Sequence, residues 1–257
     1  MHAIMIRRLV ILLATVSSLA LAQDKPAGAA TPPPDPKPPT APENPPVEKL
    51  DEFRYRIGQV TLDKKSREIR FPTKVNMDQG LLEYLIVLAK GKVHESLLVT
   101  EISPTHLNLA FTLLRYSPSP ELFSLTDENG RVIEEHPKVS DTVKAGARIA
   151  IDLEWIDKGK TRRIAANEWI QHIVTSAHMK AGPWLYTGAD IQEGKYIPEI
   201  TGDLCAIMVD PGGITNYPGD DNGDNVWFAF PKRVPPVGTP VTVIISPYTK
   251  TQDLPKP

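Results

Sequence analysis

The sequence predicts an α+β fold, in which a β-rich, mixed or antiparallel sheet has one main helix packed on it. Residues 148–155 alternate between apolar and polar side chains, as a half-buried strand does. Residues 84–89 are apolar at every position, as a central strand covered on both faces requires. Residues 104–114 instead repeat their apolar side chains at intervals of three and four, which predicts the helix.

Strands are expected throughout the region before the helix. Residues 53–57 alternate, and the alternation changes phase beside Gly58, which suggests a β-bulge. Residues 64–66 are expected to turn the chain into a partner strand around residues 69–71. Residues 93–100 alternate weakly and are also predicted to be a strand.

The helix has a clear beginning and end. Ser103 can cap the free amides of the first turn, and Pro104 suits the first helical position. Pro118 and Pro120 prevent the helix from continuing. The face toward the sheet consists of four apolar side chains: Leu107, Ala110, Phe111 and Leu114.

Turn signals separate the strands that follow the helix. Asn129-Gly130 is a strong signal for a hairpin turn. Residues 158–160 are expected to reverse the chain after the strand at 148–155. Three further strands are predicted near residues 184–187, 204–209 and 241–246.

Residues 1–22 have the pattern of a cleavable bacterial signal peptide. Arg7 and Arg8 form its basic region, residues 9–19 are apolar, and small residues at positions 20 and 22 place the cleavage before Gln23. The apolar stretch is shorter than the roughly 18–20 residues that a membrane-spanning helix needs. We therefore expect a periplasmic or secreted protein with no transmembrane segment after signal cleavage. Export by the general secretory route is expected, with the twin-arginine route as the alternative.

Residues 23–46 are predicted to be a proline-rich, disordered tether. They hold ten of the 26 prolines and almost no apolar side chain to bury, so ordering them would cost more entropy than packing could offset. A docking ligand for a proline-binding module is the alternative. Residues 47–257 remain for a globular domain, with a division into two subdomains near residue 140 left open.

Charge and cysteine content exclude several classes of protein. Loss of the signal peptide with its two arginines takes the net charge from −2 to about −4, and no basic block marks a surface for nucleic acid. The single cysteine, Cys205, excludes an internal disulfide and a four-cysteine zinc or iron–sulfur site. No cofactor is identified from these features, and Cys205 is expected to be a buried, inert thiol.

The first candidate site is the segment Gly91-Lys92-Val93-His94-Glu95-Ser96. In a strand, His94 and Ser96 would share one face and Glu95 would lie on the other. A histidine beside a serine is the arrangement of a base with its nucleophile, so His94, Glu95 and Ser96 are candidate catalytic residues. Two alternatives stay open, namely a ligand-recognition site and a strand edge without a functional role.

The second candidate site is the acidic loop, residues 218–225. Asp220, Asn222 and Asp224 follow the D-x-N-x-D pattern that places oxygen ligands around calcium. Pro231 stands where a twelve-residue calcium loop would supply its closing glutamate. The alternative is an exposed turn, because turns use the same residue types.

Several segments of the chain resemble the YdjY-domain family of exported bacterial proteins. The resemblance covers most of residues 55–247, and the Gly-Lys-x-His-Glu-Ser block is its most specific part. It implies that a shared site would contain His94 and Glu95, with the acidic loop as a further candidate, but it implies no established activity. The segments that carry it are Val75-Asn76 and residues 80–84, 91–98, 104–107, 184–188, 202–204 and 234–241.

These observations lead to an expected function and two alternatives. We expect an exported cell-envelope protein that acts as a non-enzymatic binding or assembly module for an envelope protein, a glycan or an ion such as calcium. The first alternative is a metal-assisted or histidine-dependent hydrolase that uses residues 91–96. The second is a purely structural domain, in which neither His94 nor the acidic loop lines a pocket.

Overall fold

The computed structural model describes residues 47–249, which belong to one compact unit. The predicted signal peptide (residues 1–22) and tether (residues 23–46) lie outside the described residues. Within residues 47–249, no helix is long and apolar enough to cross a membrane.

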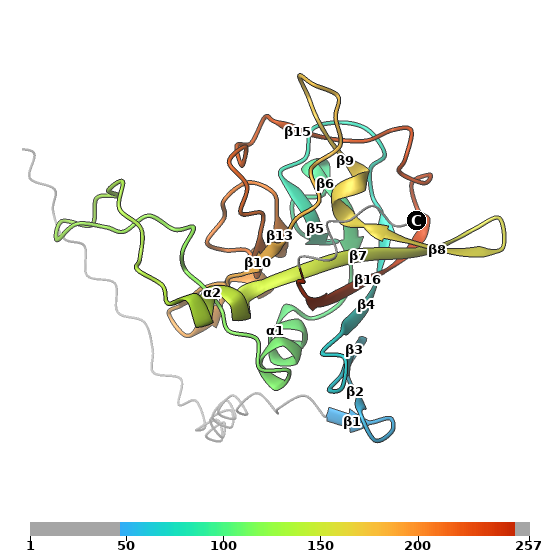
Figure 1. The fold of residues 1–257 in the computed structure, drawn as a ribbon, viewed down its shortest axis with the longest axis horizontal. Coiled ribbons are helices and arrows are strands. Elements are labelled where there is room, and N and C mark those ends of the chain that lie inside the picture. The colour runs from blue at the N-terminus through green and yellow to red at the C-terminus, as the bar shows by residue number, and fades with distance from the viewer. Residues whose placement is uncertain (1–46, 250–257) are drawn as a thin grey trace, which may run out of the picture. The chain divides into compact units, whose positions relative to one another are not determined.

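Eight strands close into a barrel (Figure 1). Its closure depends on an antiparallel pairing in which Lys74 lies opposite Val99 and Val75 lies opposite Leu98. Around the barrel the strands follow in the order β4 (Ile69–Val75), β16 (Pro240–Pro247), β7 (Arg148–Asp157), β10 (Trp184–Tyr186), β14 (Thr215–Asn216), β13 (Asp203–Ala206), β5 (Tyr84–Leu88) and β6 (Ser96–Thr100).

Other strands extend the barrel or lie beside it. β3 (Val60–Asp63), β2 (Arg54–Ile57) and β1 (Val47–Lys49) continue the sheet outward from β4, and β8 (Lys160–Ala165) pairs with β7. Two small ribbons complete the strands, β9 (Ile170–His172) with β15 (Trp227–Ala229) and β11 (Ile191–Gln192) with β12 (Lys195–Tyr196). The helical elements are α1 (Pro104–Leu113), α2 (Asp141–Ala147), α3 (Ile197–Thr201) and the 3₁₀ turns η1 (Val93–Glu95) and η2 (Ala166–Trp169).

The predicted α+β sheet with one main helix packed on it is therefore wrong. Helices hold only about 14% of the described residues, and the strands close into a barrel in place of an open sheet with a helix packed on it. The helix at 104–113 exists as predicted, with Ser103 accepting a hydrogen bond from the His106 amide. It packs against β3 and α3, and its Phe111 ring stacks on Tyr186 of β10 with 4.1 Å between ring centroids.

The phase change beside Gly58 has a different cause from the predicted bulge. Gly58 lies in the two-residue turn between β2 and β3, with a positive φ of 55° that suits a tight hairpin. A β-carbon at Gly58 would lie 2.5 Å from Nδ1 of His106, so α1 also approaches the turn closely. In a two-residue hairpin Ile57 lies opposite Val60, so the apolar positions change phase along the sequence just as they do at a bulge.

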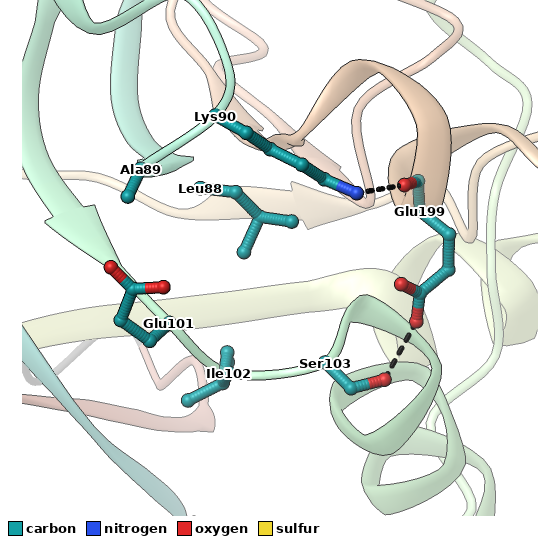
Figure 2. Close-up of a pocket in the computed structure, with 7 residues that line it drawn as sticks. All are labelled: Leu88, Ala89, Lys90, Glu101, Ile102, Ser103 and Glu199. Atoms are coloured by element: carbon teal, nitrogen blue, oxygen red, sulfur yellow. Dashed lines mark hydrogen bonds between the residues drawn. The ribbon is translucent and has the colours of Figure 1, made fainter.

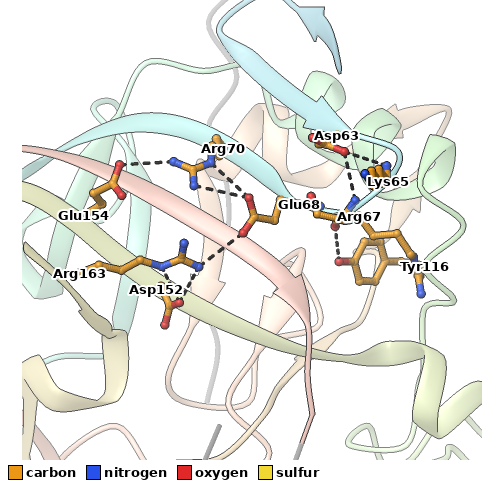
Figure 3. Close-up of polar contacts among 10 residues, drawn as sticks. Asp63, Lys65, Arg67, Glu68, Arg70, Tyr116, Asp152, Glu154 and Arg163 are labelled. Atoms are coloured by element: carbon orange, nitrogen blue, oxygen red, sulfur yellow. Dashed lines mark hydrogen bonds and ion pairs between the residues drawn. The ribbon is translucent and has the colours of Figure 1, made fainter. Parts of the chain in front are cut away.

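A network of charged side chains covers part of the outer barrel face (Figure 3). Arg70 of β4 lies 3.3 Å from Glu154 of β7, and Arg163 of β8 lies 2.8 Å from Asp152 of β7. Ile244 of β16 pairs with both Arg70 and Asp152, so it lies between them on the same face. It is fully buried there, because the long charged side chains shield it from water.

Candidate functional site

The segment from Gly91 to Ser96, here called the 91–96 turn, is not the strand that its alternation predicted. Residues 93–95 form η1, and β6 begins only at Ser96. The side chain of His94 is therefore 78% exposed, whereas Ser96 is fully buried and its Oγ donates a hydrogen bond to the Leu98 carbonyl at 3.0 Å. The predicted common face of His94 and Ser96 does not form.

Asn76, at the end of β4, holds the 91–96 turn in place. Its Nδ2 donates hydrogen bonds to the carbonyl oxygens of Val93, at 2.5 Å, and Ser96, at 2.7 Å. The amide of Glu83 donates a third hydrogen bond to the carbonyl of Glu95 at 3.0 Å. Contacts from two other parts of the chain thus fix the backbone of the turn on both sides of Glu95.

Two glycines allow a second segment to approach the turn. Gly202 follows α3 with a positive φ of 85°, and a β-carbon there would lie 3.0 Å from Cα of Gly91. The amide of Leu88 donates a hydrogen bond to the Gly202 carbonyl at 2.8 Å. This close contact brings Asp203, the next residue, to the side chain of Lys92.

Tyr84, Lys92, Asp203 and Asp210 form a polar group that we call the Lys92 cluster. Nζ of Lys92 donates a hydrogen bond to the Tyr84 hydroxyl and lies 3.7 Å from Oδ2 of Asp203. The Tyr84 hydroxyl in turn donates to Oδ2 of Asp210 at 3.1 Å. Lys92 is 41% exposed, so it covers the buried members of the cluster and also reaches solvent.

Burial controls the protonation of the Lys92 cluster. It raises the pKa of Tyr84 far above the usual value, and the Asp210 and Asp203 charges add to this effect, so the phenol stays neutral. Burial also raises the pKa of Asp203, although the positive charge of Lys92 opposes that rise. One oxygen of Asp203, Oδ1, is buried without a hydrogen-bond partner in the described part of the chain.

Glu83 and Glu95 form a carboxyl pair beside the Lys92 cluster. Burial raises the pKa of Glu83 first, and the charge of Glu95 and a hydrogen bond with its carboxyl raise it further. The exposed imidazole of His94 lies next to the pair, with Nε2 at 3.5 Å from Oε2 of Glu95. Glu83 can therefore retain a proton above the usual range of a glutamate side chain, and the pair can bind a cationic group in its place.

The acidic loop approaches the carboxyl pair at one point. Asp220 and Asp224 are exposed and Asn222 is half-buried, and the charge of Asp224 contributes to the raised pKa of Glu83. Between residues 47 and 249, no three or more His, Cys, Asp or Glu side chains are grouped so that they could hold a metal ion. Calcium binding by Asp220, Asn222 and Asp224 stays a prediction.

The sequence pointed to residues 91–96 as a candidate site, but it did not point to the residues from other segments that lie beside them. Asn76, Glu83, Tyr84 and Asp203 carry no recognisable catalytic spacing, so composition and periodicity gave no reason to choose them. Each of these residues does lie in a segment that carries the family resemblance. The 91–96 turn is where these segments converge in space, through the hydrogen bonds and the glycine contact described above.

Cys205 has the inert character expected of it. It is buried in β13, and burial raises the pKa of its thiol to about 12, so the nucleophilic thiolate is absent at neutral pH.

Comparison with known proteins agrees with the resemblance. The profile of the YdjY domain matches residues 60–246, which is most of the chain and all of the closed barrel apart from the last residue of β16. No curated protein and no solved structure matches the chain. On this evidence, the chain belongs to the YdjY domain family.

Proposed function

We propose that this chain is an exported cell-envelope protein that acts as a non-enzymatic binding module, and that it binds a cationic group at the 91–96 turn. The observation that carries the proposal is the Glu83–Glu95 carboxyl pair. Two carboxyl groups held together repel each other when both are ionised, and a bound cation removes this repulsion. The favoured ligand is a basic side chain of an envelope protein, and calcium is the second ligand considered.

The position of the pair supports a role in binding. His94 is exposed beside it, and Asp224 adds a further negative charge from the acidic loop. The backbone of the turn is fixed by Asn76 and Glu83, so little ordering entropy remains to be lost when a ligand binds. The proposed periplasmic or secreted location rests on the signal-peptide pattern of residues 1–22.

A thermal melt of residues 23–257 tests the proposal. Samples contain EDTA, calcium, zinc, or a lysine- and arginine-containing peptide, each added separately. A ligand at 100 times its dissociation constant stabilises a fold by about 2.7 kcal/mol, which corresponds to a rise in midpoint of roughly 5–10 °C for a domain of this size. We expect Glu95→Gln and Asp224→Asn to reduce the rise, and Glu52→Gln, an exposed glutamate elsewhere, to leave it unchanged.

Failure of every cation to raise the midpoint would contradict the proposal. A calcium-specific rise that is lost in Asp220→Ala and Asp224→Ala but kept in Glu95→Gln would place the ion in the acidic loop instead of at the turn. A rise with the basic peptide alone would support a basic side chain of a protein as the ligand.

A hydrolase that uses residues 91–96 is the second candidate function. Two observations favour it. The His94 imidazole lies near the Glu95 carboxyl group, and the neighbouring Glu83 has a raised pKa. Acid–base catalysis uses groups of both kinds. Ser96 cannot be its nucleophile in this arrangement, because it is buried and bonded to the Leu98 carbonyl. Ester, phosphoester or peptide hydrolysis that is lost in His94→Ala would establish the hydrolase and overturn the binding module.

A further inference from the structure

A pocket with a volume of about 520 Å³ lies apart from the 91–96 turn (Figure 2). It is formed where β5 ends, where β6 leads into α1, and where α3 packs beside them. Its volume is within the range of roughly 300–1,000 Å³ that small-molecule sites occupy. The residues that line it are Leu88, Ala89, Lys90, Glu101, Ile102, Ser103 and Glu199, none of which belongs to the turn.

The apolar part of the pocket is fixed by backbone hydrogen bonds. Leu88 and Ile102 are buried in the main core and also line the pocket. The amide of Leu88 donates to the Gly202 carbonyl at 2.8 Å, and the amide of Ala89 donates to the Thr100 carbonyl at 3.1 Å. This surface is therefore formed before any ligand arrives.

The carboxylate of Glu199 is already used within the protein. It accepts hydrogen bonds from Oγ of Ser103 at 2.6 Å and from the amide of Thr105 at 3.0 Å, at the start of α1. Burial opposes its ionisation, but the bonds from Ser103 and Thr105 prevail and lower its pKa, so it stays anionic. The positive charge of Lys90 also helps to lower this pKa, and both hydrogen bonds hold the Glu199 carboxylate at the start of α1.

Lys90 and Glu101 are the two other charged residues that line the pocket. Nζ of Lys90 donates one hydrogen bond, to the Glu199 carbonyl at 2.5 Å, which orients it and leaves two of its three donors unused. The Glu101 carboxylate has no hydrogen-bond or ion-pair partner anywhere in residues 47–249. Figure 2 shows these two charges on opposite sides of the pocket, with Leu88 between them.

We propose that this pocket binds a small zwitterion of the amino-acid or dipeptide type. Its ammonium group pairs with Glu101, its carboxylate pairs with Lys90, and its apolar side chain lies over Leu88 and Ile102. Both charges are near solvent, so the ion pairs are weak and the expected dissociation constant is about 1 mM. The inference concerns a different part of the surface from the proposed function and does not depend on it.

Titration of ¹⁵N-labelled residues 23–257 with the dipeptide Ala-Leu, followed by NMR, tests this proposal. We expect saturable shifts of the amides at residues 88–90, 101–103 and 199. N-acetyl-Ala-Leu lacks the ammonium group and Ala-Leu amide lacks the carboxylate, so each should bind about two- to fivefold more weakly, as loss of one solvent-exposed ion pair predicts.

Two variants test whether each charge has its assigned role. Glu101→Gln should bind Ala-Leu and N-acetyl-Ala-Leu with the same affinity, because the partner of the ammonium group is gone. Lys90→Gln should bind Ala-Leu and Ala-Leu amide with the same affinity, because the partner of the carboxylate is gone. Glu52→Gln and Lys138→Gln change exposed residues outside the pocket and should bind as the unmodified chain does.

This crossed pattern is specific to the proposed orientation. If Glu101→Gln removed the effect of the amide, and Lys90→Gln removed the effect of the N-acetyl group, the proposed orientation of the ligand and the roles of both residues would be overturned. No shifts up to about 20 mM dipeptide, roughly twenty times the expected dissociation constant, would overturn the proposal. Shifts confined to residues outside the pocket, or equal binding by both charge variants and the unmodified chain, would overturn it as well.

Discussion

Asn76 offers the sharpest test of how the candidate site is held together. Replacing it with alanine removes the two hydrogen bonds from Nδ2 to the Val93 and Ser96 carbonyls. Each such bond contributes about 1 kcal/mol net, so the free energy of unfolding should fall by about 2 kcal/mol. For a domain of this size, the thermal midpoint should fall by roughly 4–8 °C.

Asn76→Asp makes the same prediction more demanding. The carboxylate has nearly the shape of the amide but can only accept hydrogen bonds, so it would face two carbonyl oxygens without a proton to share. At pH 7 this variant should be less stable than Asn76→Ala. At acidic pH it should recover part of the difference, because the protonated carboxyl regains one donor.

Urea melts followed by tryptophan fluorescence give the stabilities, and amide hydrogen exchange at Glu95 shows whether the turn opens locally. Asn225→Ala is the control, because Asn225 is exposed and has no side-chain hydrogen bond within residues 47–249. A loss below about 0.5 kcal/mol for Asn76→Ala, or an Asn76→Asp variant as stable as the unmodified chain, would refute the reasoning.

Three further predictions concern the same structure. Gly202→Ala should lower the free energy of unfolding by about 1–3 kcal/mol more than Gly130→Ala does, as measured by urea melts. Both glycines have a positive φ, but only a β-carbon at Gly202 would meet a neighbouring atom. Glu83→Gln should stabilise the fold at pH 7 by roughly 0.5 kcal/mol. The pKa of Glu83 is raised by folding, so the unmodified chain loses stability as pH rises through that pKa, and melts between pH 4 and pH 7 should show the gain from glutamine growing with pH. In urea melts, Ile244→Ala should lower the free energy of unfolding by about 2–4 kcal/mol, because the side chain is fully buried. Arg70→Met should lower it by less than about 1 kcal/mol, because the ion pair of Arg70 with Glu154 is half-exposed.

Local features of the fold were predictable where a short stretch of sequence contains the whole cause. The helix at 104–113 begins at a serine cap followed by proline, and the strand that became β7 alternates over its own length. The 91–96 turn shows where local reasoning fails. Its alternation suited a strand, but hydrogen bonds from Asn76 hold residues 93–95 in a 3₁₀ turn and direct His94 to solvent.

The candidate site was predictable in part for the same reason. The sequence by itself determined which segment carries the polar block, since Lys92, His94 and Glu95 are adjacent in the chain. Only the tertiary structure decided that Glu83 and Asp203 complete it and that Ser96 turns inward. It likewise decided that the strands close into a barrel, because closure requires β4 to pair with β6 on one side and β16 on the other. These pairings join residues far apart in the chain, and the periodicity of one strand describes which face is buried but not which strand lies beside it.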